Sequence, residues 1–121
     1  MRCGTDICDV NRMQESIEKL GDKFLKRVFT EKEIAYCEAK KMKKFESYAA
    51  RFAGKEAVYK ALASEKTSDG VFTEVEIQNA DNGKPYVVLH GTLKELYQQE
   101  NIEISLSHEK EYAIAMAIVY S

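Results

Sequence analysis

Polar and apolar residues at the start of the chain predict a strand followed by a helix. Residues 2–8 are short and rich in Cys, Thr and Ile, which is typical of a strand. Over residues 10–20 the apolar positions recur at helical spacing. Asp9 is a candidate N-cap for this helix and Gly21 a candidate stop.

Two further helices are predicted before the middle of the chain. Thr30 is followed three residues later by Glu33, a capping-box pattern that opens a short helix through about residue 41. A Pro-free stretch rich in Ala and long charged side chains then predicts a central helix over residues 45–63. The polar residues 64–70 predict a loop after it.

The second half changes to the period of a β-strand. The alternation predicts strands over residues 72–78, 86–89, 102–107 and 112–120. The Asp81-Asn82-Gly83 turn signal joins the first two of them as a hairpin. Between the hairpin and the third strand, residues 92–99 predict a short helix with Leu93, Leu96 and Tyr97 facing inward.

The last predicted strand, residues 112–120, is apolar on both faces. One face carries Tyr112, Ile114, Met116 and Ile118, and the other Ala113, Ala115, Ala117 and Val119. An antiparallel strand with one solvated face should be polar on one side, so the pattern predicts a subunit interface. The chain of 121 residues is predicted to be a single α+β domain, 1–121, with N-terminal helices packed on an antiparallel sheet.

The central helix carries a carboxylate among apolar residues. At about 100° per residue, one stripe contains Tyr48, Ala49, Phe52, Ala53, Tyr59 and Ala63. Glu56 falls in the middle of this stripe, and Lys60 lies one turn later at its edge. Two interpretations follow: an ordinary Glu–Lys pair at i,i+4, or a carboxylate bound to a partner or a metal.

Composition and charge narrow the functional classes. The chain is 45% hydrophobic and 31% charged with a net charge of −2, which argues against a nucleic-acid binder by overall charge. A run of roughly 18 apolar residues, as a membrane span requires, is missing from the sequence. The three cysteines lack metal-ligand spacing, and a reducing, cytoplasmic setting is expected. The lysine cluster at residues 40–44 is interpreted as a solvated face.

Several residues have the chemistry of a magnesium and phosphate site. Asp6 and Glu56 are hard oxygen ligands on different elements, and two carboxylates with substrate phosphates and waters are how Mg²⁺ is usually held. The cationic candidates for phosphate contact are Arg51, Lys55, Lys60 and His108. The turn at residues 82–85 offers backbone N–H groups, although a plain hairpin turn also explains it.

Four ordered motifs run along nearly the whole chain. They are Gly4-Thr5-Asp6-Ile7 with Val10 and Arg12, Arg51-Phe52-Ala53-Gly54-Lys55-Glu56-Ala57 with Lys60-Ala61, Glu74-Val75-Glu76-Ile77 with Asn82-Gly83-Lys84-Pro85, and Ser105-Leu106-Ser107-His108. Together they resemble the holo-acyl-carrier-protein synthase family, the small trimeric class of 4′-phosphopantetheinyl transferases. The resemblance implies Mg²⁺-dependent transfer of phosphopantetheine from coenzyme A to a serine of an acyl carrier protein, in fatty acid biosynthesis.

The resemblance also implies a role for each matching residue. Asp6 and Glu56 would hold the metal, and Lys60 would contact the phosphates and stabilise charge during transfer. The expected contacts with coenzyme A are Arg51, Lys60, Asn82, Gly83, Pro85 and His108. The base would be Glu56 or a metal-activated water. The family implies a homotrimer with active sites between subunits, and an acidic carrier protein would dock on Arg12, with Arg27 as a further candidate.

Three departures from the family pattern stand out. The loop Ala63–Gly70 lacks the family's Gly-rich sequence, Thr73-Glu74-Val75 replaces a more usual aromatic residue or Asp, and Gly54 replaces an Ala inside the helix. A Gly there costs up to about 1 kcal/mol of helix propensity. Two non-catalytic alternatives remain: a coenzyme A or carrier-protein binding module, and a structural oligomer in which Glu56 and Lys60 are a buried pair.

Overall fold

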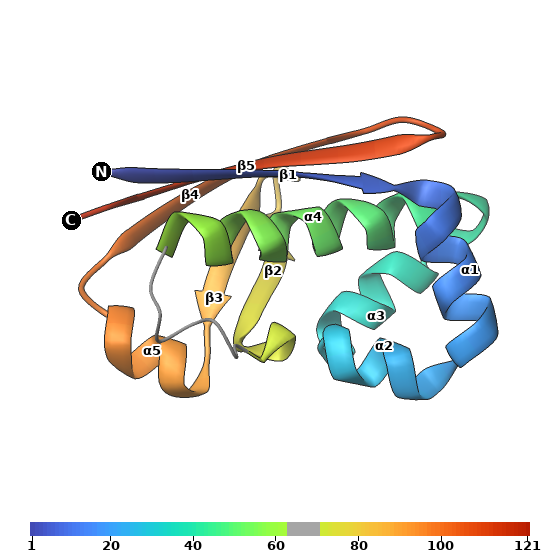
Figure 1. Ribbon diagram of the computed structural model, residues 1–121, viewed down its shortest axis with the longest axis horizontal. Coiled ribbons are helices and arrows are strands. Elements are labelled where there is room, and N and C mark those ends of the chain that lie inside the picture. Colours follow the sequence, from blue (N-terminus) through green and yellow to red (C-terminus); the bar gives the residue numbers. More distant parts are fainter. Residues whose placement is uncertain (63–70) are drawn as a thin grey trace.

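The computed structural model describes residues 1–62 and 71–121 as an α+β fold (Figure 1). The predicted loop over Ala63–Gly70 lies outside the described residues. In chain order the elements are β1 (Arg2–Asp9), α1 (Val10–Leu20), α2 (Asp22–Val28), α3 (Glu31–Glu38), η1 (Lys41–Lys43), α4 (Lys44–Leu62), η3 (Phe72–Glu74), β2 (Val75–Asn79), β3 (Pro85–Leu89), α5 (Gly91–Tyr97), β4 (Asn101–His108) and β5 (Tyr112–Tyr120). The predicted class, helices packed on antiparallel strands, is confirmed.

Local capping signals define α1 and α3 as the sequence predicts, whereas α2 was not predicted and begins without a side-chain cap. The Asp9 side chain accepts a hydrogen bond from the Arg12 backbone N–H at the start of α1, and Gly21 ends that helix with a φ of 67°. The capping box is complete at α3, because Thr30 and Glu33 each bind the other's backbone N–H. This helix ends at Glu38, earlier than expected.

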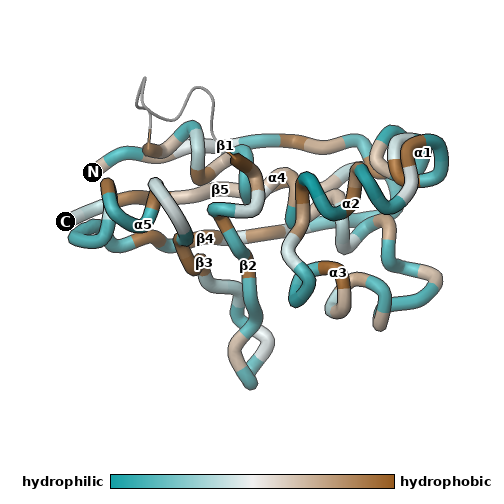
Figure 2. The backbone as a smooth tube through the Cα atoms, turned by 90° about the horizontal axis from the view of Figure 1, so that it is seen from below, coloured by the Kyte–Doolittle hydropathy of each residue, from teal (hydrophilic) through white to brown (hydrophobic). Residues whose placement is uncertain are grey.

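The described strands form two antiparallel sheets that both pack against α4, with the smaller sheet next to β4 (Figure 1). One sheet has the order β1-β5-β4, and the other is the β2–β3 hairpin. Figure 2 shows the hairpin projecting away from the larger sheet on the β4 side, with a hydrophilic turn at its free end. The predicted hairpin is confirmed, but it begins at Val75, because Phe72–Glu74 form a 3-10 turn.

The contact between α4 and the larger sheet depends on small residues. Gly4 lies so close to α4 that an added Cβ would collide with the Ala57 carbonyl and the Ala61 backbone nitrogen. At Gly54 an added Cβ would run into the side chains of Ile77 and Leu106. Gly54 lowers the helix propensity of α4, but its lack of a side chain allows α4 to pack closely against both neighbouring sheets.

The helix α4 is buried on most of its sides, and not along a single apolar stripe as predicted. Tyr48, Ala49 and Ala53 are fully buried as expected, but Phe52 and Tyr59 are only half-buried. The buried residues extend around the helix because it lies between a sheet, a hairpin and the N-terminal helices. In α5, Leu93 is buried while Leu96 is 41% exposed, so the inward orientation predicted for Leu96 is wrong.

One face of β5 is buried and the other is open. The alanines of β5 are buried against α4, whereas Ile114 is 51% exposed and Met116 45% exposed. Ile7 of the neighbouring strand is 62% exposed on the same outer face. The doubly apolar pattern of the sequence thus produces a sheet with an exposed apolar face. Across residues 1–62 and 71–121, no helix is long and apolar enough to cross a membrane.

Candidate functional site

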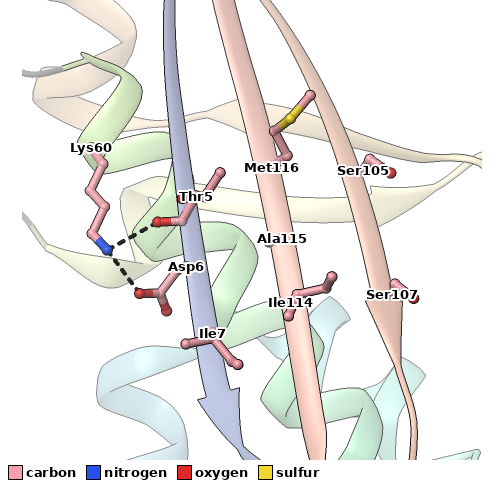
Figure 3. Close-up of a pocket in the computed structure, with 9 residues that line it drawn as sticks. All are labelled: Thr5, Asp6, Ile7, Lys60, Ser105, Ser107, Ile114, Ala115 and Met116. Carbon is pink, nitrogen blue, oxygen red and sulfur yellow. Dashed lines mark hydrogen bonds and ion pairs between the residues drawn. The ribbon is translucent and has the colours of Figure 1, made fainter.

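Asp6, Glu56 and Lys60 meet where β1 crosses α4. The alternation of β1 turns Asp6 toward α4, and the Lys60 Nζ atom lies 3.0 Å from its Oδ1 atom (Figure 3). The same ammonium group donates a hydrogen bond of 3.0 Å to the Thr5 carbonyl. The Lys60 side chain is 54% exposed and the Asp6 side chain 17%, so this ion pair is open to a ligand.

Glu56 is electrostatically coupled to this pair. Burial raises the pKa of Glu56, the charge of Asp6 raises it further, and Lys60 opposes both effects. Glu56 is half-buried at the edge of the helix's buried surface, and not in the middle of an apolar stripe as predicted. Two neighbouring carboxylates with a single ammonium group form a site that favours an additional cation.

Cys8 borders the cluster but does not have the properties of a nucleophile. Burial, followed by the charges of Asp6 and Asp9, raises the pKa of the Cys8 thiol to about 11. A thiol with this pKa stays protonated near neutral pH. The chemistry of the cluster therefore belongs to its carboxylates and its ammonium group.

The first pocket lies on the outer face of the larger sheet, beside the Asp6–Lys60 pair (Figure 3). It has a volume of about 530 Å³ and is lined by Thr5, Asp6, Ile7, Lys60, Ser105, Ser107, Ile114, Ala115 and Met116. Strand pairing places Thr5, Met116 and Ser105 in one row across the three strands. The pocket combines an apolar floor, three hydroxyl groups and one charged edge.

The second pocket lies between α4, α3, the hairpin and β4. It has a volume of about 310 Å³ and is lined by Tyr36, Lys40, Lys43, Ser47, Ala50, Arg51, Asn79, Gly83, Pro85, Leu106 and His108. Four of the sequence-predicted coenzyme A residues, Arg51, Gly83, Pro85 and His108, thus meet in it. Asn82 does not line this pocket, and its side chain accepts a hydrogen bond from the Lys84 backbone N–H inside the turn.

The cationic groups of the second pocket are held by specific partners. The Arg51 guanidinium lies 3.8 Å from the centre of the Tyr36 ring and donates a hydrogen bond to the Asn79 side chain. Among the described residues its buried Nε atom has no hydrogen-bond partner. The Nδ1 atom of His108 lies 3.0 Å from a Glu46 carboxylate oxygen. With Lys40 and Lys43 at the rim, the pocket suits an anionic ligand.

The third pocket contains Arg12, the predicted carrier-protein contact. It has a volume of about 480 Å³ and is lined by Ile7, Cys8, Asp9, Arg12, Met13, Ser16, Phe24, Phe52 and Tyr112. Ile7 lines the first pocket as well, so the two pockets share a border on β1. Arg27 is exposed on α2 and does not line this pocket.

Lys55 does not lie where a phosphate could reach it, which corrects its expected role. Its side chain is fully buried, and its Nζ atom lies 2.6 Å from a carboxylate oxygen of the equally buried Glu33. Burial lowers the pKa of Lys55, and the Glu33 charge opposes that effect. The predicted row of phosphate-binding cations on α4 is therefore reduced to Arg51 and Lys60.

Sequence reasoning missed the partners that hold the predicted residues. Tyr36, Glu46 and Asn79 come from three elements and contact Arg51 or His108. They carry no local motif, because each acts through a contact distant in sequence. Glu33 does carry a signal, its place in the capping box, but that signal predicts an exposed cap and not a buried ion pair.

The predicted site residues fall into two separate groups in this structure, the cluster at Asp6 and the second pocket at His108. Asp6 lies on β1 and His108 on β4, which are the two outer strands of the β1-β5-β4 sheet. The carboxylate cluster and the second pocket are thus at opposite edges of this sheet. In the described part of the chain, no three His, Cys, Asp or Glu side chains gather as a metal site.

Comparison with known families defines the class of the protein. A family model described as the 4′-phosphopantetheinyl transferase superfamily matches residues 2–117. The match covers all four sequence motifs and all three pockets. The chain belongs to this superfamily, as its motifs predicted.

Named relatives specify the class further. The chain is 48% identical over 122 aligned positions to holo-acyl-carrier-protein synthase of Ruminiclostridium cellulolyticum, covering 98% of this chain and 91% of the relative. The crystal structure of the Helicobacter pylori holo-acyl-carrier-protein synthase in complex with coenzyme A is similar, with a TM-score of 0.82 and 30% identity over 97% of this chain and 98% of that one. The Bacillus anthracis synthase in complex with coenzyme A (3′,5′-ADP) has a TM-score of 0.79 and 33% identity, covering 99% of this chain and 96% of that one.

Proposed function

We propose that this protein transfers the 4′-phosphopantetheine group of coenzyme A to a serine hydroxyl of an apo acyl carrier protein. The products are the holo carrier protein and adenosine 3′,5′-bisphosphate. The observation that carries the proposal is the Asp6–Glu56–Lys60 cluster, found in a chain nearly half identical to a holo-acyl-carrier-protein synthase. Two carboxylates can hold a Mg²⁺ ion and an accessible ammonium group can bind phosphate oxygens, and both are recurring parts of phosphoryl-transfer sites.

The carboxylate cluster fits a Mg²⁺ ion. Asp6 and Glu56 would supply hard oxygen ligands, and the Lys60 ammonium beside Asp6 supports a preference of this position for positive charge. With two protein carboxylates, the remaining ligand positions would be filled by substrate oxygens and water. A bound Mg²⁺ would neutralise negative charge on the pyrophosphate of coenzyme A.

Lys60 is positioned to act on the transferred phosphoryl group. Its Nζ atom uses donors for Thr5 and Asp6, and an ammonium group has three. Among the described residues the third donor has no partner, so it can bind a phosphate oxygen and stabilise its charge as the serine oxygen attacks in line. The raised pKa of Glu56 makes this carboxylate one candidate for accepting the serine proton, and a water molecule is the other.

The second pocket is the proposed site for the nucleotide end of coenzyme A. Arg51, His108, Lys40 and Lys43 supply positive charge for its phosphates. Pro85 and the Tyr36 ring supply flat surface for the adenosine. Asn82 would act indirectly, by shaping the turn that carries Gly83 and Pro85.

We further propose a homotrimer with active sites between neighbouring subunits. The cluster at Asp6 and the pocket at His108 lie at opposite edges of one sheet. One coenzyme A molecule would therefore bind between the Asp6 edge of one subunit and the His108 edge of its neighbour. The exposed apolar face that includes Ile114 and Met116 would supply the contact surface. Native mass spectrometry should detect a trimer, and a monomer with full activity would contradict this assembly.

The carrier protein is proposed to dock at the third pocket. Arg12 lies at this pocket among apolar side chains, one of which, Phe52, is one helical turn before Glu56. Carrier proteins of this kind are acidic, so charge reversal in Arg12→Glu should raise KM for the carrier about tenfold or more while KM for coenzyme A stays unchanged. Arg27→Glu is the matched test of the weaker candidate, and an unchanged carrier KM in both variants would place docking elsewhere.

The reaction itself is tested by mass spectrometry of an apo acyl carrier protein. Incubation with this protein, coenzyme A and Mg²⁺ should add one phosphopantetheine, and EDTA should prevent the addition. Glu56→Gln should lower transfer by about a thousandfold or more and keep the fold, because it removes a metal ligand without changing side-chain size. Full activity in this variant would contradict the metal assignment, and bound coenzyme A without transfer in the unaltered protein would favour a binding module.

The proposed reaction would take place in the cytoplasm, as part of fatty acid biosynthesis. Cys3, Cys8 and Cys37 are free thiols in the structure, as expected in a reducing compartment. A subcellular fractionation with an antibody against this protein would check this location.

A further inference from the structure

Three polar side chains on α4 reach across to the same segment of chain. Arg51, Lys55 and Tyr59 follow one another at intervals of four residues, so they lie along one side of the helix. Arg51 donates to the Asn79 side chain, Lys55 donates to backbone carbonyls, and Tyr59 donates to the carbonyl of residue 71. The segment from residue 71 to residue 79, which leads into and forms β2, is thus bound along α4.

Lys55 is the central and most buried member of this row. Its Nζ atom donates to the Val75 carbonyl at 2.5 Å and to the Phe72 carbonyl at 3.1 Å. Its third contact is the Glu33 carboxylate at 2.6 Å. All three donors of the ammonium group are therefore occupied by protein atoms on three other elements, α3, η3 and β2.

Glu33 connects the same point to the rest of β2 and to α3. Its second carboxylate oxygen accepts a hydrogen bond of 2.8 Å from the Ile77 backbone N–H. Its first oxygen also accepts from the Thr30 N–H, which closes the capping box of α3. The Lys55–Glu33 pair thus binds α3, α4 and the hairpin strand β2 at one buried position.

The position matters because the second pocket lies between these elements. Arg51 on α4 faces Asn79 at the end of β2, and the Asn79 amide donates to the Gly83 carbonyl in the hairpin turn. A shift of the hairpin along α4 would move Asn79, Gly83 and Pro85 relative to Arg51. Lys55 sets this register, since its hydrogen bonds to backbone carbonyls are directional.

We propose that Lys55 is a positioning residue for coenzyme A: with Glu33, it fixes the hairpin against α4 and so shapes the second pocket. The inference rests on the proposed function for its ligand. Lys55 lines none of the three pockets described above and is fully buried, so it acts through the hairpin and not by touching the substrate. An apolar residue would fill the same space without fixing the register of the hairpin.

The test separates positioning from stability with a charge-neutral pair of substitutions. Lys55→Met alone leaves Glu33 as an unpaired buried charge, whereas Glu33→Gln combined with Lys55→Met does not. Gln is also accepted in a capping box. Lys94→Met, an exposed lysine on α5, is the matched control for the loss of one lysine.

The readouts are KM for coenzyme A and backbone amide hydrogen exchange. In the double variant we expect KM for coenzyme A to rise about tenfold, with kcat changed less than about threefold. Exchange should become about tenfold faster over residues 75–89 and stay unchanged in β1 and β5. Lys94→Met should change neither quantity.

A folded double variant with unchanged KM and unchanged exchange overturns the proposal. If that variant does not fold, Glu33→Gln alone replaces it, because it weakens the same contact between Lys55, α3 and β2, and unchanged KM for coenzyme A with unchanged exchange over residues 75–89 there also overturns the proposal. Hydrogen exchange needs no turnover, so it tests Lys55 whatever the reaction. An unaltered protein that transfers no phosphopantetheine would instead overturn the proposed function alone.

Discussion

Lys55 and Lys60 lie five residues apart on α4, and each is paired with a carboxylate. The Lys55–Glu33 distance is 2.6 Å and both side chains are fully buried. The Lys60–Asp6 distance is 3.0 Å, and the side chains are 54% and 17% exposed. The same two functional groups are thus placed in an enclosed and in an open environment on one helix.

The surroundings of each pair show what it is built to do. All three N–H donors of Lys55 bind protein atoms, so Lys55 has no donor for a ligand. Loss of Lys55 would leave the Glu33 carboxylate buried without a partner. Within residues 1–62 and 71–121, Lys60 has one donor left for a ligand. An exposed pair of this kind contributes only about 0–1 kcal/mol to stability. Burial, and not residue type, therefore separates the structural lysine from the functional one.

The largest expected effect is the loss of the buried pair. Lys55→Met should lower the free energy of unfolding by about 3–5 kcal/mol, because Glu33 is left buried without its partner. Urea unfolding followed by circular dichroism measures this loss, and Lys94→Met should stay within about 0.5 kcal/mol of the unaltered protein. A loss below about 1 kcal/mol would remove the distinction between the two lysines.

The second-largest effect is expected on removing Lys60 from the exposed Lys60–Asp6 pair, and it should lower activity and not stability. Lys60→Met should lower kcat for transfer by about 10²–10³-fold, the usual cost of removing one group that stabilises developing charge. The free energy of unfolding should change by no more than about 1 kcal/mol. Transfer close to that of the unaltered protein would assign Lys60 to structure, and a large loss of stability would do the same.

Sequence patterns predicted most elements because their signals are local. The caps at Asp9 and Thr30 and the alternation in β4 and β5 depend on neighbouring residues, and the structure confirms them. The predicted start of the hairpin, residue 72, was wrong, because contacts with residues distant in sequence set the true start at Val75. Glu74 does not enter the strand, because its carboxylate accepts from the Leu93 N–H in α5 and its carbonyl from the His90 N–H.

The candidate site was predicted less evenly. The roles of Asp6, Glu56 and Lys60 followed from a family resemblance, and the structure places the three together, although Glu56 is not at the centre of an apolar stripe. The Lys55–Glu33 pair could not be predicted, because it joins residues on different helices. An exposed cap and a lysine on a charged helix have the same local pattern as this buried pair.

The smallest expected effect concerns the titration of Glu56, whose pKa depends on the charges of Asp6 and Lys60. Burial, and then the charge of Asp6, raises the pKa of Glu56 above the ordinary value of 4.5. A carboxyl whose pKa is raised by folding contributes stability that is present below its unfolded value and lost as the pH rises through its folded value. Glu56→Gln should therefore be at least as stable as the unaltered protein at pH 7, with the advantage vanishing below pH 4.5.

Carbon-13 NMR of the Glu56 carboxyl group measures this titration directly, without any turnover. Asp6→Asn should lower its midpoint, because the neighbouring charge is removed. Mg²⁺ should lower the midpoint of the unaltered protein as well, since a bound cation favours the ionised carboxylate, and EDTA should reverse the change. A midpoint that responds to Asp6→Asn but not to Mg²⁺ would leave the two carboxylates coupled to each other without forming a metal site. In that case Lys60 would be the group of this cluster that contacts the phosphates of coenzyme A.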